Sequence, residues 1–261
     1  KGKTKITALI KKILATRELR RPFFDGFSSI SLLISLFKVV FMLTKHIQSL
    51  QHKLVKEAVQ IRKNRRVRRE KNQALVVGEK MVKELSRHFL AEALFSLELQ
   101  TLKAENSYTV SKEVLKKITG VPAPDKMAAL FPLPNHSLDK KDHLLILDEI
   151  EDPGNLGTLF RTSLGLKWDG IFLTPKTTDP FSEKALRASK GSVFFQPYAY
   201  MEKDSLKNLL EKDSYEVFLA DIDGKEPAKL VIKKKTALIL SAESKGVSEE
   251  FLPISQKISL P

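Results

Sequence analysis

The segment from Leu144 to Pro175, LLILDEIEDPGNLGTLFRTSLGLKWDGIFLTP, constrains the fold of this chain more than any other. It opens with an unbroken apolar run, residues 144–147, which is typical of a strand buried on both faces of a parallel sheet. Acidic residues and the pair Pro153-Gly154 end this run. Apolar residues then recur at helical spacing from Asn155, a favourable N-cap residue, and a second apolar strand is predicted at 170–173. The sequence therefore predicts a strand–loop–helix–strand unit of an α/β protein.

The loop of this unit carries side chains that suit a ligand site. In parallel α/β sheets, ligands usually bind where loops leave the carboxyl ends of the strands. The loop and the helix after it present Gly154, Asn155, Gly157 and, six residues beyond the asparagine, Arg161. From spacing alone, an N-cap residue followed by a surface arginine explains this pattern equally well.

Two strings carry a family resemblance. DPGNLGTLFRT, which includes Asn155 and Arg161, resembles the first signature motif of the SpoU/TrmH family of RNA ribose methyltransferases, in the SPOUT superfamily. SAESKGVSEEFL, which follows an apolar strand expected at 236–240, is similar to the second motif, with Glu243 and Gly246 in the motif positions. The third motif begins at Ile258 but lacks its Ser-Leu-Asn loop and final helix. We therefore expect either a truncated sequence or a catalytically impaired protein.

The resemblance implies a fold, a reaction and partners. It implies a SPOUT (alpha/beta knot) domain with a parallel sheet at 137–261, preceded at 42–136 by a smaller α/β domain that is similar to ribosomal protein L30e and recognises RNA. The polar segment 135–142 has the composition of the linker between them. The implied reaction is methylation of a ribose 2′-hydroxyl with S-adenosyl-L-methionine, on ribosomal RNA in preference to transfer RNA. The resemblance also implies a homodimer, and we expect a cytoplasmic location.

The resemblance assigns roles to individual residues. A ribose 2′-hydroxyl is a poor nucleophile at neutral pH, so its proton must be removed or offset and the methyl donor must be held in line. Arg161 would assist the hydroxyl, either as a base or as an electrostatic stabiliser. Asn155 would orient the substrate or shape the loop, and Glu243 would position Arg161 or the RNA. The backbone would bind the donor at Ser241, Ala242, Gly246, Ile258 and Leu260.

A basic block supports an RNA partner independently of the motifs. The chain has 261 residues and a formal net charge of +14, and a surplus of this size commonly serves a polyanion. Residues 62–71 hold seven cations against a single glutamate, so they repel one another unless an anion is bound. The block lacks aromatic residues, which favours contact with the RNA backbone over base stacking. The predicted RNA-binding residues are Arg62, Lys63, Arg65, Arg66, Arg68 and Arg69.

Residues 1–41 differ in composition from the rest of the chain. They are basic at first, then apolar from Phe27 to Leu43 with Lys38 inside the apolar stretch, and Met42 is the first methionine. We interpret residues 1–41 as upstream sequence that precedes the functional protein. The alternative is a targeting or anchoring segment, which would make the protein organellar or attached to a membrane.

Patterns elsewhere predict further elements. Apolar runs predict strands at 74–77, 93–97, 127–131, 191–196 and 216–220. Helical spacing predicts helices around 50–61 and at 111–118, 182–189 and 206–211, with the basic block as a turn after the first of these. The pair Asp223-Gly224 predicts a turn after the strand at 216–220.

Other chemistries find little support in the sequence. The absence of cysteine excludes disulfides and thiolate catalysis. The five histidines lack metal-ligand spacing, so we expect no metal, and there is no G-x-S-x-G or GxxxxGK[ST] motif. The competing hypothesis is a non-catalytic RNA-binding module that has lost the donor pocket. It predicts salt-dependent RNA affinity without donor binding.

Overall fold

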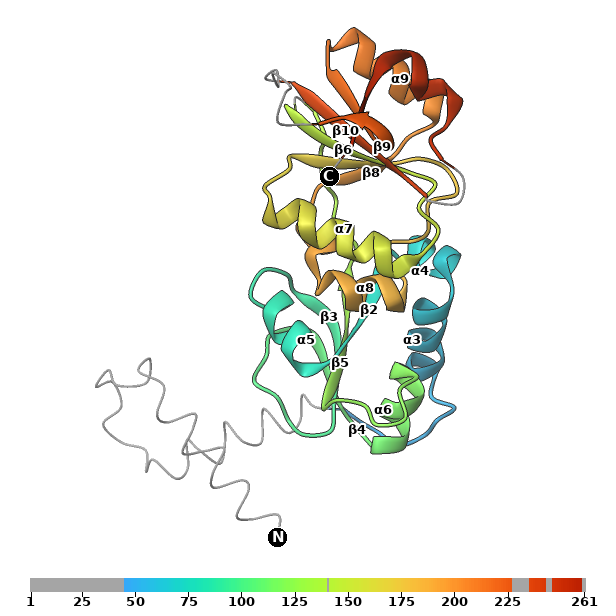
Figure 1. Cartoon of the computed structure of the whole chain (residues 1–261). Coiled ribbons are helices and arrows are strands. Elements are labelled where there is room, and N and C mark those ends of the chain that lie inside the picture. Colours follow the sequence, from blue (N-terminus) through green and yellow to red (C-terminus); the bar gives the residue numbers. More distant parts are fainter. Residues whose placement is uncertain (1–44, 140, 227–234, 243–245, 260–261) are drawn as a thin grey trace, which may run out of the picture. The chain divides into compact units, whose positions relative to one another are not determined.

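The computed structural model describes residues 45–139, 141–226, 235–242 and 246–259. They form two β-sheets, each covered by helices (Figure 1). Of the predicted features, the segment 1–41, Glu243 and Leu260 lie outside these residues. Within the described part of the chain, no helix is long and apolar enough to cross a membrane.

The N-terminal sheet is mixed and has five strands in the order β1-β4-β3-β5-β2. Strand β3 runs parallel to β4 and antiparallel to β5, which in turn runs antiparallel to β2. Apolar residues of two helices, among them Val55, Ile61 and Leu115, pack with Phe95 and Leu130 of the sheet. The elements are β1 (Lys45–Ile47), α3 (Lys53–Lys63), α4 (Arg65–Lys71), β2 (Gln73–Val77), α5 (Glu79–Leu85), β3 (Ala91–Ser96), β4 (Ala104–Val110), α6 (Lys112–Thr119) and β5 (Met127–Pro132).

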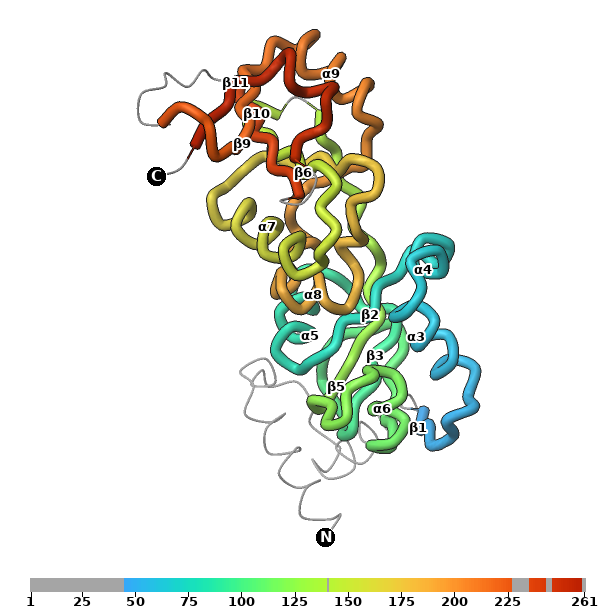
Figure 2. The backbone as a smooth tube through the Cα atoms, turned by 45° about the vertical axis from the view of Figure 1, so that its right-hand side comes forward, coloured from blue at the N-terminus to red at the C-terminus, as the bar shows by residue number. Residues whose placement is uncertain are grey.

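The C-terminal sheet is fully parallel, with six strands in the order β11-β9-β10-β6-β7-β8. This confirms the predicted α/β fold with a parallel sheet. Figure 2 shows β11, β9 and β10 side by side at one end of the sheet. The elements are β6 (His143–Asp148), α7 (Pro153–Gly165), β7 (Gly170–Leu173), α8 (Glu183–Ser189), η2 (Ser192–Phe194), β8 (Tyr198–Tyr200), α9 (Lys203–Lys212), β9 (Glu216–Lys225), β10 (Thr236–Ser241), η4 (Glu249–Ile254) and β11 (Ser255–Ile258).

Strand β6 shows why its sequence is apolar throughout. Leu145 and Leu147 face a core shared with α7, whereas Leu144 and Ile146 face a second core shared with α9. Alternate side chains of a strand point to opposite faces, so a strand covered by helices on both sides needs apolar residues at every position. Helices α7 and α9 accordingly lie on opposite faces of the C-terminal sheet (Figure 1).

The segment 191–196, predicted as a strand, forms the short helix η2 instead. Gly191 enters it in the left-handed region, with φ of 86°, and the backbone then turns through a bond from the Phe194 N–H to the Gly191 carbonyl. This turn buries Phe194 between the sheets, where its ring contacts Phe131 of the N-terminal sheet and Phe181 of the C-terminal part. The apolar run therefore reflects a shared core and not a strand.

Three further local predictions are wrong. Asn155 is not the N-cap of α7, because the helix begins at Pro153 with Asp152 as its cap. The basic block is not a turn, because Arg62 and Lys63 end helix α3 and residues 65–71 form helix α4. The predicted turn at Asp223-Gly224 is part of strand β9, where the glycine is needed for another reason. A Cβ atom at Gly224 would lie 2.2 Å from the carbonyl carbon of Ile258, so glycine lets β11 approach β9 closely.

Candidate active site

The start of helix α7 is fixed by a conventional N-cap. The Asp152 carboxylate accepts a hydrogen bond from the Asn155 N–H at 2.8 Å, and Pro153 occupies the first turn, where no N–H is needed. Asp152 also pairs with Lys184 of α8 at 2.5 Å. The Asn155 side chain is exposed at the beginning of the helix.

One face of α7 is packed so closely that it requires a glycine. A Cβ atom at Gly157 would lie 2.4 Å from the carbonyl oxygen of Ala185 in α8, closer than side chains approach a backbone oxygen. Leu156 and Phe160 are fully buried on the same side. Arg161, one helical turn after Gly157, is exposed. Among the described residues its guanidinium has no hydrogen bond or ion pair.

The carboxyl end of β6 carries a buried acidic residue that the motif comparison did not single out. Asp148 is 1% exposed, and its two carboxylate oxygens accept hydrogen bonds from the Thr174 hydroxyl and from the Ser248 N–H, both at 2.9 Å. Glu149 follows with φ of 51°, and its N–H donates to the Thr174 hydroxyl oxygen at 2.9 Å. The sequence signal was an acidic residue placed directly after a buried apolar run.

The Glu149 carboxylate pairs with two lysine side chains. Its side chain is 11% exposed and accepts a hydrogen bond from the Lys203 amino group at 2.7 Å. The Lys176 amino group lies 3.4 Å from the same carboxylate oxygen. Burial disfavours the charged form of Lys203, but the bond to Glu149 and the nearby charge of Asp148 outweigh it, so the pKa of Lys203 is raised. The carboxyl edge of the sheet is therefore a network of charged groups held in fixed positions.

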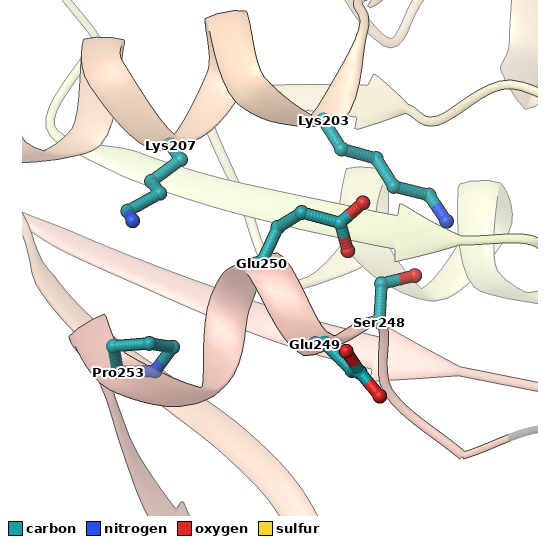
Figure 3. A pocket seen from close by; sticks show the side chains of 6 residues that line it. All are labelled: Lys203, Lys207, Ser248, Glu249, Glu250 and Pro253. Atoms are coloured by element: carbon teal, nitrogen blue, oxygen red, sulfur yellow. The ribbon is translucent and has the colours of Figure 1, made fainter.

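A pocket of about 570 Å³ adjoins this network between α9 and η4. Lys203 and Lys207 reach from α9 toward the segment that carries Ser248, Glu249 and Glu250 (Figure 3). Both signs of charge line the pocket, so it does not select for an anion or a cation alone.

The predicted donor-binding residues lie at two places along the carboxyl edge of the C-terminal sheet. Ser241 ends β10 and stands opposite Asp148 in the parallel register, and Ala242 accepts a bond from the Gly246 N–H at 3.1 Å. Gly246 has φ of 68°, and no described residue beyond its chain neighbours comes within 4 Å of the position that a Cβ atom would take there. Ile258 ends β11, on the far side of β9 from β10. The described residues give no direct contact between Arg161 and either place.

The basic block divides into bound and exposed arginines. Arg68 is 4% exposed, and its guanidinium donates to Asp179 at 2.8 Å and to the carbonyl oxygens of Ile61 and Arg62 at 2.7 Å each. These bonds and its burial keep Arg68 from contacting RNA in this conformation. The side chains of Lys63, Arg66 and Arg69 are exposed.

Two arginines of α4 stack on an aromatic ring. The guanidinium carbons of Arg65 and Arg69 lie 4.9 Å and 5.3 Å from the centre of the Tyr200 ring in β8. Burial raises the pKa of Tyr200 to about 12, against the opposing effect of Arg65, and its hydroxyl donates to the Thr178 carbonyl oxygen. Arg62 is also partly enclosed, and its guanidinium lies 3.7 Å from the Glu183 carboxylate.

In the part of the chain that the structure describes, no group of three or more His, Cys, Asp or Glu side chains could hold a metal ion.

Comparison with known proteins identifies the C-terminal sheet. Residues 142–261 match the model of the SpoU rRNA Methylase family. It is this C-terminal region of the chain that is similar to the family. The match runs from the start of β6 to the end of the chain, so the SpoU region contains the predicted residues of α7 and of the segment after β10. The basic block lies outside it.

Relatives extend the similarity beyond the SpoU region. The 23S rRNA (guanosine(2553)-2′-O)-methyltransferase RlmP of Bacillus subtilis is 27% identical over 217 residues, which covers 80% of this chain and 86% of the relative. An uncharacterized tRNA/rRNA methyltransferase of Synechocystis is 31% identical over 164 residues, covering 60% of this chain and 59% of the relative.

Solved structures share the fold. An rRNA methyltransferase from Sinorhizobium meliloti superposes with a TM-score of 0.74 at 23% identity, covering 84% of this chain and 89% of that one. The SpoU methyltransferase AviRb from Streptomyces viridochromogenes, solved with AdoMet, gives a TM-score of 0.70 at 18% identity, covering 81% and 89%. Both alignments are too long for one sheet alone, so the shared fold includes part of the N-terminal sheet.

Proposed function

We propose that this chain methylates a ribose 2′-hydroxyl of RNA with S-adenosylmethionine, and that its substrate is ribosomal RNA. The SpoU family match over residues 142–261 carries this proposal, because it covers the sheet edge that holds Asn155, Arg161 and the segment after β10. The relative from Bacillus subtilis, which aligns with most of this chain, is named as a ribosomal RNA 2′-O-methyltransferase. It supports ribosomal RNA ahead of transfer RNA.

The residues present fit the methyl donor. Ser241 and Ala242 are small, and Gly246 has a backbone in the left-handed region and no Cβ atom, so backbone groups there can approach a ligand closely. The AdoMet-bound structures of the Sinorhizobium and Streptomyces proteins support the same cofactor. When bound, S-adenosylmethionine supplies a methyl group activated by a sulfonium sulfur. Ser241, Ala242, Gly246, Ile258 and Leu260 remain the proposed donor-binding residues.

Arg161 is assigned to the reacting oxygen. The ribose oxygen gains negative charge as its proton leaves, and an arginine guanidinium offers fixed positive charge and several N–H donors. Arginine keeps its proton in proteins, so we assign Arg161 to electrostatic stabilisation of this oxygen and not to proton abstraction. Its exposure on α7 leaves it free to reach a substrate. Asn155, exposed at the start of the same helix, would orient the ribose, and Glu243 keeps its proposed positioning role.

RNA recognition is assigned to the N-terminal sheet and the basic block. The exposed side chains of Lys63, Arg66 and Arg69 are suited to phosphate contacts, with Arg62 and Arg65 partly available. Arg68 is removed from the proposed RNA-binding set because its donors are used within the chain. The division into an L30e-like domain at 42–136 and a SPOUT domain at 137–261 stays a proposal, as do the homodimer and the cytoplasmic location.

Titration calorimetry with S-adenosylmethionine, followed by transfer of a labelled methyl group to unmodified 23S rRNA transcripts, tests the proposal. We expect donor binding and incorporation into 23S rRNA that exceeds incorporation into a transfer RNA transcript. Mapping the product by resistance of the 2′-O-methylated position to alkaline hydrolysis would identify the ribose. RNA binding without any donor binding would contradict the proposal and favour the non-catalytic RNA-binding module.

A further inference from the structure

We propose that Arg65, Arg69 and Tyr200 bind one backbone phosphate of the RNA substrate, close to the ribose that is methylated, an inference that rests on the proposed function. The guanidinium carbons of Arg65 and Arg69 lie 4.9 Å and 5.3 Å from the centre of the Tyr200 ring. The two arginines would contact the phosphate, and Tyr200 is a positioning residue that holds them. These three residues are called the Tyr200 site below.

The Tyr200 site holds positive charge that no carboxylate offsets. The two arginines of α4 outside the site, Arg66 and Arg68, each form an ion pair with a carboxylate. Within the described ranges, neither Arg65 nor Arg69 has such a partner. Both guanidinium carbons lie within 5.3 Å of one ring centre, so their like charges repel each other. A phosphate bound by both arginines would relieve this repulsion.

The Tyr200 ring is a fixed and neutral support for these cations. Its hydroxyl donates to the Thr178 carbonyl oxygen at 3.0 Å. Burial raises the pKa of Tyr200 to about 12, so the phenol stays uncharged and does not neutralise the arginines. A guanidinium carries several N–H donors, and contact with the face of a ring uses none of them. The ring can therefore orient both arginines while their donors remain for a phosphate.

The Tyr200 site lies at the edge of the C-terminal sheet where the reaction is proposed to occur. In the parallel register, Leu147 of β6 stands opposite Leu173 of β7, and Leu173 stands opposite Tyr200 at the end of β8. Tyr200 is thus at the carboxyl edge, two strands and roughly 10 Å from β6. It also packs against the core shared with α7, the helix that carries Arg161. A phosphate bound here would hold the RNA over the same edge and face of the sheet.

Two matched double variants test the cations. Arg65→Gln with Arg69→Gln removes both charges of the site and keeps polar side chains. Lys83→Gln with Arg87→Gln is the control, because it removes two cations at the same spacing of four residues, each of which pairs with a glutamate. In the first double variant, the slope of log RNA affinity against log salt should fall in magnitude by about one unit, the value for one phosphate. The control should keep the wild-type slope.

A second set of variants tests the ring. Tyr200→Leu keeps both arginines but leaves them to be ordered when RNA binds, so we expect the Kd and KM for RNA to rise about tenfold. Tyr200→Phe keeps the ring face and should bind RNA like the wild type. Tyr215→Leu is the control, because the Lys235 amino group lies 5.3 Å from the Tyr215 ring centre and the Tyr215 hydroxyl donates to the Lys141 carbonyl oxygen. The donor Kd, and kcat at saturating RNA, should stay unchanged in all three variants.

A combined variant separates positioning from a general role in the fold. If the ring acts only through the two arginines, Tyr200→Leu should add no further loss of RNA affinity to Arg65→Gln with Arg69→Gln. Additive losses would mean that Tyr200 supports the fold in general, and they would overturn the inference. A wild-type slope in Arg65→Gln with Arg69→Gln would overturn it as well, and this double variant decides alone if Tyr200→Leu does not fold.

The proposed function can fail separately from the Tyr200 site. Methyl transfer by the wild type, with a wild-type slope in Arg65→Gln with Arg69→Gln, would overturn the inference alone. RNA binding that depends on these arginines, without any methyl transfer, would overturn the proposed function and support the phosphate site as part of an RNA-binding module. A wild-type protein that does not bind RNA would overturn both.

Discussion

Helices α4 and α7 both carry arginines on an RNA methyltransferase fold, yet the structure treats them in opposite ways. Arg68 of α4 is buried and donates to Asp179 and to two carbonyl oxygens near the end of α3. Arg65 and Arg69 stack on Tyr200 of the C-terminal sheet. Arg161 of α7 is exposed and has no polar partner among the described residues. The denser cluster of cations is therefore available only in part.

The difference lies in the acceptors and not in the arginines. The end of a helix leaves carbonyl oxygens without partners, and Arg68 satisfies two of them at the end of α3 while pairing with a carboxylate of the C-terminal part. The repulsion within the basic block is thus relieved partly by the chain itself. A count of positive residues measures how much charge is present, but the surrounding acceptors decide which side chains remain for RNA.

The largest effect is expected when Arg68 is replaced. Arg68→Met leaves the Asp179 carboxylate, whose side chain is 14% exposed, without its cation and frees the two α3 carbonyls. Breaking one side of a buried ion pair costs about 3–5 kcal/mol, so we expect the free energy of unfolding to fall by about that amount. Denaturant unfolding followed by circular dichroism measures it.

A double variant identifies the cause of that destabilisation. Asp179→Asn removes the unpaired charge and keeps the oxygen that accepts from the Phe181 N–H. Arg68→Met combined with Asp179→Asn should therefore recover part of the stability that the single variant lacks. No recovery would mean that the α3 carbonyls, and not the ion pair, account for the effect.

Arg161→Ala is expected to act on the reaction and not on the fold. Removal of one preorganised donor to a developing oxyanion costs about 10²–10³ in kcat, and we expect a reduction of this size in methyl transfer. The free energy of unfolding should change by less than about 0.5 kcal/mol because the side chain is exposed. Arg87→Ala removes another exposed arginine, just after α5, and should leave the rate unchanged. Equal rates for both variants would remove Arg161 from the site.

The sequence predicted the C-terminal sheet well because its strands are buried on both faces. The uninterrupted apolar runs of β6, β7 and β10 have few other interpretations, and the motif at Asn155 and Arg161 fell on a helix at the edge of these strands. The sequence did not predict every functional residue at the carboxyl edge of this sheet. The sequence signal for Asp148 is limited to its place directly after an apolar run, because its partners Thr174 and Ser248 are 26 and 100 residues away.

The errors share a physical cause, which is packing between distant segments. Phe194 looked like a strand residue because the sequence does not show that Phe131 of another sheet covers it. Gly224 looked like a turn residue because the close approach of Ile258 is not visible in the sequence. The burial of Arg68 likewise depends on Asp179, 111 residues further along the chain. Local patterns predicted local elements, and long-range packing decided the rest.

Gly157 and Gly165 offer a smaller test of how closely α7 packs against α8. Gly157→Ala places a methyl group 2.4 Å from the Ala185 carbonyl oxygen, and such overpacking typically costs about 1–3 kcal/mol of stability. Gly165→Ala meets nothing within 4 Å at the end of the same helix and should be neutral or stabilising by up to about 1 kcal/mol. Thermal unfolding compares the two. If Gly157→Ala is as stable as Gly165→Ala, the helices do not pack as closely as described.

The smallest effect tests which cations of the basic block meet RNA. Lys63→Ala and Arg66→Ala each remove an exposed cation, so the slope of log affinity against log salt should fall in magnitude by about one unit for each phosphate that the variant no longer binds. Arg68→Met removes the same charge from a buried position and should leave the slope unchanged, provided that binding is measured where this variant is folded. Filter binding or fluorescence anisotropy across a salt series gives the slopes. A fall in slope for Arg68→Met as large as that for Lys63→Ala would show that Arg68 exchanges its internal acceptors for RNA phosphate, and the contrast between α4 and α7 would then hold only for the free protein.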